Sequence, residues 1–304
     1  MLCCTKSFDV DPVDSFPAGG EPPGTVPAVA VRRALMRAVA AGKPLVPPRA
    51  WGALLSARSF VGDGPIVGMP VMHGVIVVAP HPDDETIGCG GLLALLSRAG
   101  IATTVIFATD GEATRGASAA PPEVAALRCN EAQRACAVLG VTSTTFLHLA
   151  DGHLDEVVAD LGAAIRTAGE ESPATLLCPW FGDGHPDHAA VAEAIVRSGL
   201  PDDRELWSYE TWTPLPANRI VDISAVVDVK RQAMAAHVTA GLAFDIEATL
   251  GLNRYRSIHA LMGRGHAEAY LAASLGDYRR LMDASATALS GIKSLLRRDG
   301  RGSR

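Results

Sequence analysis

The sequence predicts an α/β protein: a Rossmann-like, open, mostly parallel sheet with helices on both of its faces. The first observation is that short apolar runs alternate with helical patterns from Gly74 onward. The second is that histidines and carboxylates directly follow the first and the fourth of these runs. Ionised carboxylates are costly to bury without partners, so they belong at the edge of the sheet, where such folds place their ligand crevice.

The alternating elements can be placed along the chain in order. The apolar runs typical of buried parallel strands are residues 75–79, 103–109, 144–149 and 175–180. Helical patterns lie between them, at about 84–99, 122–139, 154–169 and 187–198. Residues 205–223 are expected to add one or two strands, and residues 225–237 and 266–285 to be helical.

Three segments are expected along the chain. Residues 1–72 form an N-terminal extension, in which a tail precedes a short amphipathic helix over 29–44 that ends before Pro47-Pro48. Residues 73–290 form the main domain. Residues 291–304 form a basic C-terminal tail. The extension carries no pattern that indicates a function.

Composition restricts the partners and the compartment. The net charge of −6 argues against nucleic acid or an anionic membrane as the main partner. There is neither an apolar run long enough to span a membrane nor a secretory signal pattern, so we expect a cytoplasmic protein. Four of the six cysteines lie in apolar periodic stretches and are expected to be buried thiols in a reducing compartment: Cys89, Cys129, Cys136 and Cys178.

The first chemical motif follows the strand at 75–79 and reads Pro-His-Pro-Asp-Asp-Glu, residues 80–85. With a helix starting near Asp84, His81 and Asp84 can face one point while Asp83 flanks it, and imidazole plus carboxylate suits zinc. One alternative is that Asp83 or Asp84 only caps the helix. Another is a dinucleotide site, but the glycines at 88–91 come too late and the acids would repel a pyrophosphate.

The second motif, His185-Pro186-Asp187-His188, follows the fourth strand. On its own it could be a structural histidine beside a capping aspartate. In the usual doubly wound strand order, however, the first and fourth strands are neighbours, so both motifs face one crevice. The proposed ligands His81, Asp84 and His188, with one water, match a catalytic rather than a structural zinc site.

With these two motifs in place, residues 73–285 resemble the LmbE-like, or PIG-L, family of zinc-dependent deacetylases. The resemblance implies one Zn²⁺ per chain held by His81, Asp84 and His188. It also implies that Asp83 is the general base and that His185 stabilises the oxyanion. His185 is expected to be protonated and held by the carboxylate of Asp187.

The resemblance further implies that Arg128 contacts the substrate and that Asp151 accepts a sugar hydroxyl. Arg128 could instead pair with Glu131 on its own helix, and Asp151 could belong to an ordinary turn. His237 matches the end of the family's closing helix. Asp183 stands where some members carry an aromatic residue. Three loop residues could either line the crevice or be solvated: Asp110, Glu112 and Arg115.

The function implied is N-deacetylation of a small amino-sugar conjugate of the N-acetylglucosaminyl type, with no nucleic acid or membrane partner. Alternatives of the same chemistry are amidases that act on a thiol–sugar conjugate or on another acyl amide. A non-catalytic metal- or sugar-binding module and a nucleotide-binding protein are alternatives of other classes. The sequence leaves open whether the chain forms homo-oligomers and whether another divalent ion replaces zinc.

Overall fold

The computed structural model describes residues 66–68, 71–114, 117–240 and 244–286. All of them belong to the unit of the chain that begins at Pro44. The described strands are β1 (Ile66–Val67), β2 (Val75–Ala79), β3 (Thr103–Thr109), β4 (Ser143–Leu149), β5 (Thr175–Pro179), β6 (Glu205–Tyr209), β7 (Arg219–Asp222) and β8 (Ala267–Ser274).

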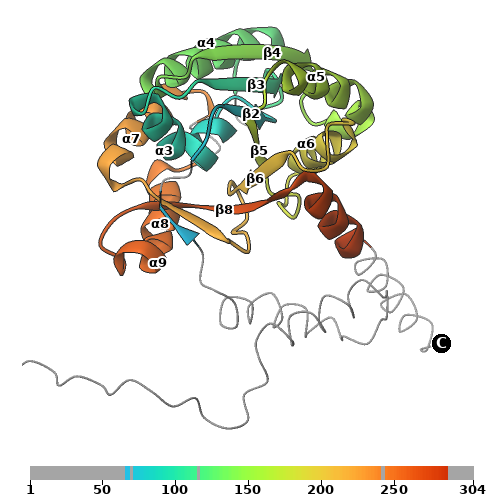
Figure 1. Ribbon diagram of the computed structural model, residues 1–304. Coiled ribbons are helices and arrows are strands. Elements are labelled where there is room, and N and C mark those ends of the chain that lie inside the picture. The colour runs from blue at the N-terminus through green and yellow to red at the C-terminus, as the bar shows by residue number, and fades with distance from the viewer. Residues whose placement is uncertain (1–65, 69–70, 115–116, 241–243, 287–304) are drawn as a thin grey trace, which may run out of the picture. The chain divides into compact units, whose positions relative to one another are not determined.

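These strands form one sheet in the order β1-β7-β8-β6-β5-β2-β3-β4, which Figure 1 shows near edge-on. β2 pairs in parallel with β3 on one side and with β5 on the other, and the parallel pairing continues to β4 and β6. β8 runs antiparallel to both of its neighbours, β6 and β7. The predicted open, mostly parallel sheet is confirmed, including the adjacency of the first and fourth predicted strands.

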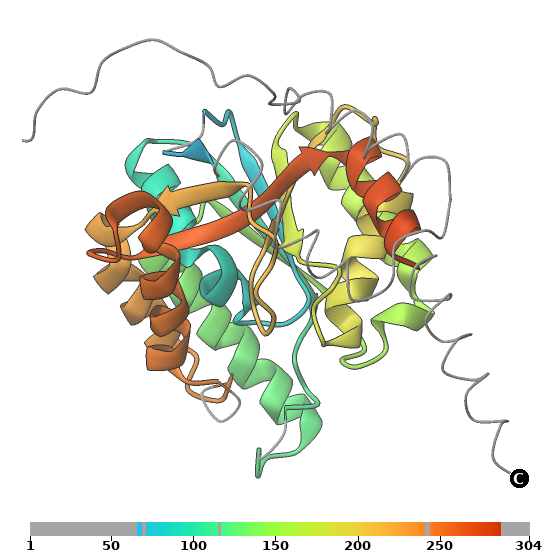
Figure 2. The same cartoon turned by 90° about the horizontal axis from the view of Figure 1, so that it is seen from below.

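The described helices are α3 (Asp84–Arg98), α4 (Pro121–Leu139), α5 (Val158–Glu171), α6 (Pro186–Arg197), α7 (Val227–Ala236), α8 (Ile246–Arg256) and α9 (Ile258–Leu261), with 3-10 turns η1 (Leu154–Glu156) and η2 (Ser224–Val226). Residues 275–286 are also helical. α3, α4 and α7 pack on one face of the sheet, and α5, α6 and residues 275–286 pack on the other (Figures 1 and 2).

The two cores explain the apolar strands. In β2, Val75 and Val77 enter the core under α3, whereas Ile76 and Val78 enter the core under α6. A strand covered on both faces must be apolar at successive positions, as the sequence is.

The helices predicted between the strands are all present, and so is the helix at 225–237. The segment predicted as helix from residue 154 begins with η1, and α5 itself starts at Val158. The prediction of helix over 266–285 is wrong for its first half, because residues 267–274 form β8. Its alanine-rich sequence carries weak local preference, and pairing with two neighbouring strands decides its conformation. α8 and α9 were not predicted. The expected helix at 29–44 and the basic tail at 291–304 lie outside the described residues.

Other sequence expectations can be compared with the described part of the chain. Cys89, Cys136 and Cys178 are buried free thiols as expected, whereas Cys129 is half-buried. β1, which falls within the predicted N-terminal extension, pairs with β7 at the edge of the sheet. Among the described residues, we find no helix with the length and apolar character needed to cross a membrane.

The helix α3, which packs on one face of the sheet, is interrupted at Cys89. Cys89 has φ −142° and ψ 17°, which is not helical. Tyr209 and Ile223 pack so closely on this segment that side chains at Gly88 and Gly91 would overlap them: a Cβ would lie 2.1 Å from the Tyr209 ring and 2.5 Å from Ile223. The break therefore separates a first half that carries Asp84 from a second half that packs in the core.

A fully buried ion pair stabilises both sides of this break. Lys230 Nζ lies 2.7 Å from Glu268 Oε1 and donates to the carbonyl of Ile87, in the first half. Glu268 accepts the backbone N–H groups of Gly91 and Leu92, which begin the second half, at 2.7 and 2.8 Å. A helix break normally leaves such groups without partners, and burying them unpaired is costly. The ion pair supplies those partners and fixes the break in place.

We expect the Glu268→Gln substitution to lower the free energy of unfolding by about 3–5 kcal/mol, because it leaves the charge of Lys230 buried without its counterion. Chemical denaturation measures the loss. The matched control is Glu193→Gln, which breaks the exposed Arg197–Glu193 pair of α6 and should cost about 0–1 kcal/mol. Equal stability of the Glu268 variant and the parent would contradict the role assigned to the pair.

Candidate functional site

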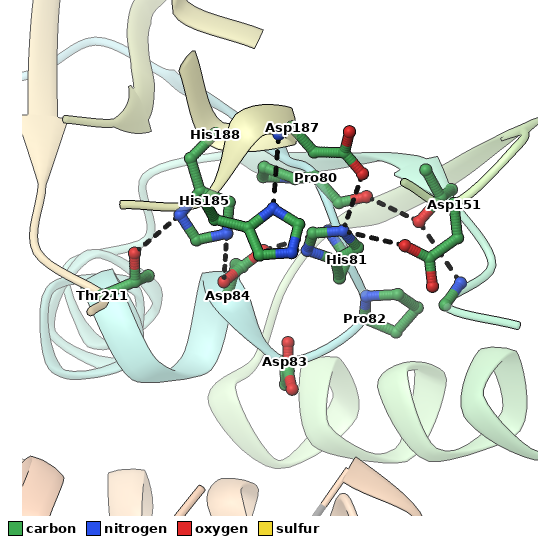
Figure 3. A network of polar contacts seen from close by, with 12 residues as sticks. Pro80, His81, Pro82, Asp83, Asp84, Asp151, His185, Asp187, His188 and Thr211 are labelled. Atoms are coloured by element: carbon green, nitrogen blue, oxygen red, sulfur yellow. Dashed lines mark hydrogen bonds and ion pairs between the residues drawn. The ribbon is translucent and has the colours of Figure 1, made fainter. Parts of the chain in front are cut away.

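The polar cluster predicted from the two motifs lies at the carboxyl ends of β2 and β5 (Figure 3). The turn after β2 supplies His81 and Asp83, and α3 begins at Asp84. His185 is the N-cap of α6, and His188 lies in its first turn. The structure therefore brings both motifs together in one cluster of side chains.

Asp84 lies between the two predicted histidine ligands. Its Oδ2 is 3.1 Å from Nδ1 of His81, and its Oδ1 is 3.4 Å from Nε2 of His188. All three side chains are nearly inaccessible to solvent. His188 Nε2 has no hydrogen-bond partner among the described residues, although it is buried. A metal ion bound beside this buried nitrogen would supply the partner that it lacks.

The far nitrogen of His81 is held by carboxylates. Its Nε2 lies 3.1 Å from Asp187 Oδ2 and 3.2 Å from Asp151 Oδ1. Asp187 also accepts the backbone N–H groups of Gly152 and Leu154, at 2.8 and 3.2 Å. The expectation that the Asp187 carboxylate holds His185 is wrong, because that carboxylate holds His81 instead.

The contacts of Asp151 also differ from those expected from the sequence. Its second oxygen accepts the backbone N–H of Ala113 at 3.0 Å, so both of its oxygens have protein partners. The carboxylate expected to accept a sugar hydroxyl is thus engaged in orienting His81.

The far nitrogen of His188 is held in the same manner. Thr211 Oγ1 lies 2.9 Å from Nδ1 of His188, and Asp183 Oδ1 lies 3.4 Å from it. Asp183 is itself fixed by the backbone N–H groups of Trp212 and Thr213. The sequence singled out Asp183 only as a departure from the family, and Thr211 was missed because it lies beyond β6 without a motif around it.

The donor set can be tested against a metal ion. Donor atoms of His81, His185 and His188 lie within 4.8 Å of one another, and a second such group comprises His81, Asp151 and Asp187. The second group uses the far nitrogen of His81, which has the carboxylate partners typical of an orienting shell behind a ligand. His81 Nδ1 and His188 Nε2 both face Asp84, so these three residues fit a nitrogen- and oxygen-ligated zinc ion better.

Asp83 lies beside this centre in a strained conformation. Its φ of 149° is rare for a residue with a side chain, and although it is the N-cap of α3 its carboxylate makes no capping hydrogen bond. The alternative in which Asp83 only caps the helix is therefore wrong. Burial raises the pKa of Asp83 to about 6, against the opposing effect of the nearby Arg128 charge. Its carboxylate thus titrates close to neutrality, as a general base requires.

Arg128 is buried and contacts Asp83, not Glu131. Its Nη2 lies 3.1 Å from Asp83 Oδ2 and donates to the carbonyl of Pro82 at 2.6 Å. Its Nη1 donates to the carbonyl of Gly111 and to Thr114. Glu131 accepts from Thr239 instead, at 3.0 Å. The alternative in which Arg128 only pairs with Glu131 is therefore wrong.

His185 is half-buried between the other two imidazoles, with ring centres 4.8 Å from His81 and 5.0 Å from His188. Burial, followed by the positive charges of His81 and His188, lowers its pKa. Its Nδ1 accepts the backbone N–H of Asp187 at 3.3 Å, so the neutral ring carries its proton on Nε2. The lowered pKa and this contact favour the neutral ring over the expected protonated one, and the neutral ring still has an N–H donor.

Two buried residues behind Asp83 complete the polar cluster. Glu85 is fully buried and accepts the backbone N–H of Asp83 at 3.0 Å. His237 Nε2 lies 3.2 Å from Glu85 Oε1. His237, which the sequence placed at the end of a closing helix, is thus connected to Asp83 through Glu85.

The loop after β3 lies beside this cluster. Glu112 accepts the backbone N–H of Asp151 at 2.9 Å, and Asp110 pairs with His148 at 2.8 Å. Arg115 lies outside the described residues.

The chain is similar to known proteins of one family. Residues 76–198 match the family model PIG-L, described as GlcNAc-PI de-N-acetylase. The chain is 31% identical over 210 residues to the diacetylchitobiose deacetylase of Thermococcus kodakarensis, covering 62% of this chain and 76% of that protein. It is 31% identical over 199 residues to a probable N-acetyl-alpha-D-glucosaminyl L-malate deacetylase 2 of Bacillus subtilis, covering 59% and 89%.

A solved structure gives the same fold. A conserved protein from Thermus thermophilus superposes with a TM-score of 0.54 at 29% identity, over 66% of this chain and 94% of that one. The matched family region contains both His-Pro-Asp motifs and ends at the C-terminus of α6.

We expect the Arg128→Met substitution to raise the pKa of Asp83 above its value of about 6, since the Arg128 charge opposes the effect of burial. Carboxyl carbon NMR titration of the metal-free protein measures this shift. Arg134→Met, at an exposed position of the same helix, is the control and should leave the titration unchanged. A lowered Asp83 pKa in the Arg128 variant would contradict the ion pair described above.

Proposed function

The chain belongs to the PIG-L family, and from that premise we propose that it is a metal-dependent deacetylase of an N-acetylglucosaminyl-type sugar conjugate. The relatives named above are a diacetylchitobiose deacetylase and a probable N-acetyl-alpha-D-glucosaminyl L-malate deacetylase, which supports an amide next to a sugar ring as the bond cleaved. The products are acetate and a free amine.

One observation carries the proposal. Asp84 faces His81 Nδ1 at 3.1 Å and His188 Nε2 at 3.4 Å, while the adjacent Asp83 has its own counterion, Arg128. A binding module needs only the ligands. A separate, buried carboxylate with a raised pKa beside those ligands is what hydrolysis requires in addition. The acid-filled turn after β2 likewise argues against a nucleotide-binding protein.

We assign the metal ligands as His81, Asp84 and His188, and zinc as the ion that suits them. A zinc ion bound there supplies a Lewis acid that polarises the acetamide carbonyl and makes water more acidic. Asp83 accepts the proton of the attacking water and returns it to the departing amine. Arg128 keeps the Asp83 carboxylate in position, 3.1 Å away.

His185 is assigned to the oxyanion. Because its Nδ1 accepts the N–H of Asp187, its Nε2–H is free to donate to the oxygen that becomes negative during the reaction. One such donor contributes about 10²–10³ in kcat in other hydrolases. Asp187 and Asp151 act through His81, whose orientation they hold.

The central test is the Asp83→Asn substitution, which keeps the shape of the side chain but removes the base. We expect zinc content to stay at one ion per chain and kcat for acetate release to fall by about 10²- to 10⁴-fold. Acetate release from N-acetylglucosaminides and metal analysis measure the two effects. Asp160→Asn, at an exposed position of α5, is the control and should keep full activity. Near-normal turnover of the Asp83 variant would remove Asp83 from its assigned role.

The metal assignment is tested through the residue behind His81. We expect Asp187→Asn to weaken zinc binding by about 10- to 100-fold, because the substitution removes the carboxylate that orients the His81 ring. Competition with a chromogenic chelator measures the dissociation constant. Asp155→Asn, on the exposed 3-10 turn nearby, is the matched control. An unchanged zinc affinity in a folded Asp187 variant would show that His81 does not depend on this carboxylate.

A further inference from the structure

A pocket of about 380 Å³ lies beside the predicted catalytic centre. Four parts of the chain form its wall: the first half of α3, the segment that follows β6, α8 with the two residues before it, and Ala269 of β8. Its volume is within the range of about 300–1,000 Å³ that is usual for small-molecule sites. None of the roles assigned so far uses it.

The pocket adjoins residues of the candidate catalytic site. Ile87 lines it, and its backbone N–H donates to the carbonyl of Asp83 at 2.9 Å, one turn earlier. Thr211 also lines it, and the hydroxyl of Thr211 is 2.9 Å from Nδ1 of His188. A substrate whose acetamide lies at Asp84 can therefore extend a neighbouring group into the pocket.

Most polar groups of the wall already have partners within the protein. Glu210 pairs with Arg256 and accepts the N–H of Leu215 at 2.8 Å. Asp245 accepts the N–H of Ala248 at the start of α8, at 2.7 Å. A polyhydroxylated ring would have to compete with these contacts, so the wall disfavours a second sugar.

The rest of the wall is aromatic and aliphatic, with one amide. Trp212, which is 58% exposed, and Phe244 both line the pocket. Asn253 also lines it, is only 5% exposed, and its Oδ1 has no hydrogen-bond partner within the described part of the chain. A buried amide oxygen without a partner gains a hydrogen bond when a ligand brings a donor.

We propose that this pocket binds an apolar group of the sugar conjugate, such as an aromatic ring or an alkyl chain, and that it sets the substrate preference. This proposal rests on the proposed function. The apolar group can come from either of two parts of the conjugate, an aglycone on the sugar or an acyl chain longer than acetyl. Trp212 and Phe244 supply the contact area, and Asn253 Oδ1 at the wall accepts a hydrogen bond from a polar atom that adjoins the apolar group.

The experiment measures binding separately from catalysis. Calorimetry on the zinc-loaded Asp83→Asn protein gives dissociation constants for methyl and phenyl N-acetylglucosaminides, and for methyl glucosaminides with acetyl or hexanoyl on nitrogen. We expect the phenyl or the hexanoyl ligand to bind at least about tenfold more tightly than its small counterpart. The arm that shows the preference identifies the source of the apolar group.

Two further variants locate the preference. Ala248→Phe narrows the pocket from α8, and Trp212→Ala removes an exposed aromatic wall without disturbing the core. Each should reduce the ratio of the two dissociation constants to about one. Ala159→Phe, at an exposed site in the first turn of α5, should leave the ratio unchanged. Because the readout is a ratio, a partial loss of folded protein does not imitate the effect.

The outcomes separate this proposal from the proposed function. If the wild-type protein releases acetate but neither arm shows a preference, the pocket proposal is overturned and the function stands. If a preference exists but both pocket variants keep it, the pocket proposal is again overturned. If the variants abolish the preference but the wild-type protein releases no acetate from any ligand, the pocket stands as a binding site and the proposed function fails.

Discussion

The break in α3 is the constraint on which the rest of the site depends. Neighbouring side chains pack so closely against this helix that there is no room for a Cβ atom at Gly88 or Gly91. Cys89, which lies between these glycines, departs from helical geometry. Lys230 and Glu268 then satisfy the backbone groups that the break exposes. Both come from segments far along the chain. The direction of the first half of α3, and with it the position of Asp84, is therefore set by tertiary contacts and not by local helix preference.

The side chains of the proposed mechanism are likewise fixed in orientation by contacts with neighbouring residues. Asp187 contacts Nε2 of His81, and the hydroxyl of Thr211 contacts Nδ1 of His188. The other nitrogen of each ring therefore faces Asp84. Asp83 is held in a rare backbone conformation with Arg128 against it. Orientation by a surrounding shell reduces the reorganisation needed during the reaction, which is the main source of electrostatic stabilisation in enzymes.

The sequence predicted the sheet and the meeting of the two motifs because both depend on patterns along the chain. Apolar runs reveal buried strands, and the parallel order brings the carboxyl ends of β2 and β5 together. The partner of Asp187 could not be predicted in this way, since it depends on how α6 is rotated against the sheet. For the same reason Thr211 and the Lys230–Glu268 pair carried no signal: only the fold brings their partners to them. The alanine-rich β8 was misread because tertiary pairing overrode a weak local preference.

The residues that we assign to catalysis and those that line the pocket lie in different regions of the chain. Residues 76–198 contain every residue that we assign to zinc, base or oxyanion. Most of the pocket wall lies after that region, between Glu210 and Ala269. Contacts with the rest of the conjugate can change there without disturbing Asp84 or its histidines, because α8 does not hold them. Thr211 joins the two regions, since it lines the pocket and its hydroxyl also contacts His188, so a substitution at Thr211 affects chemistry and preference together.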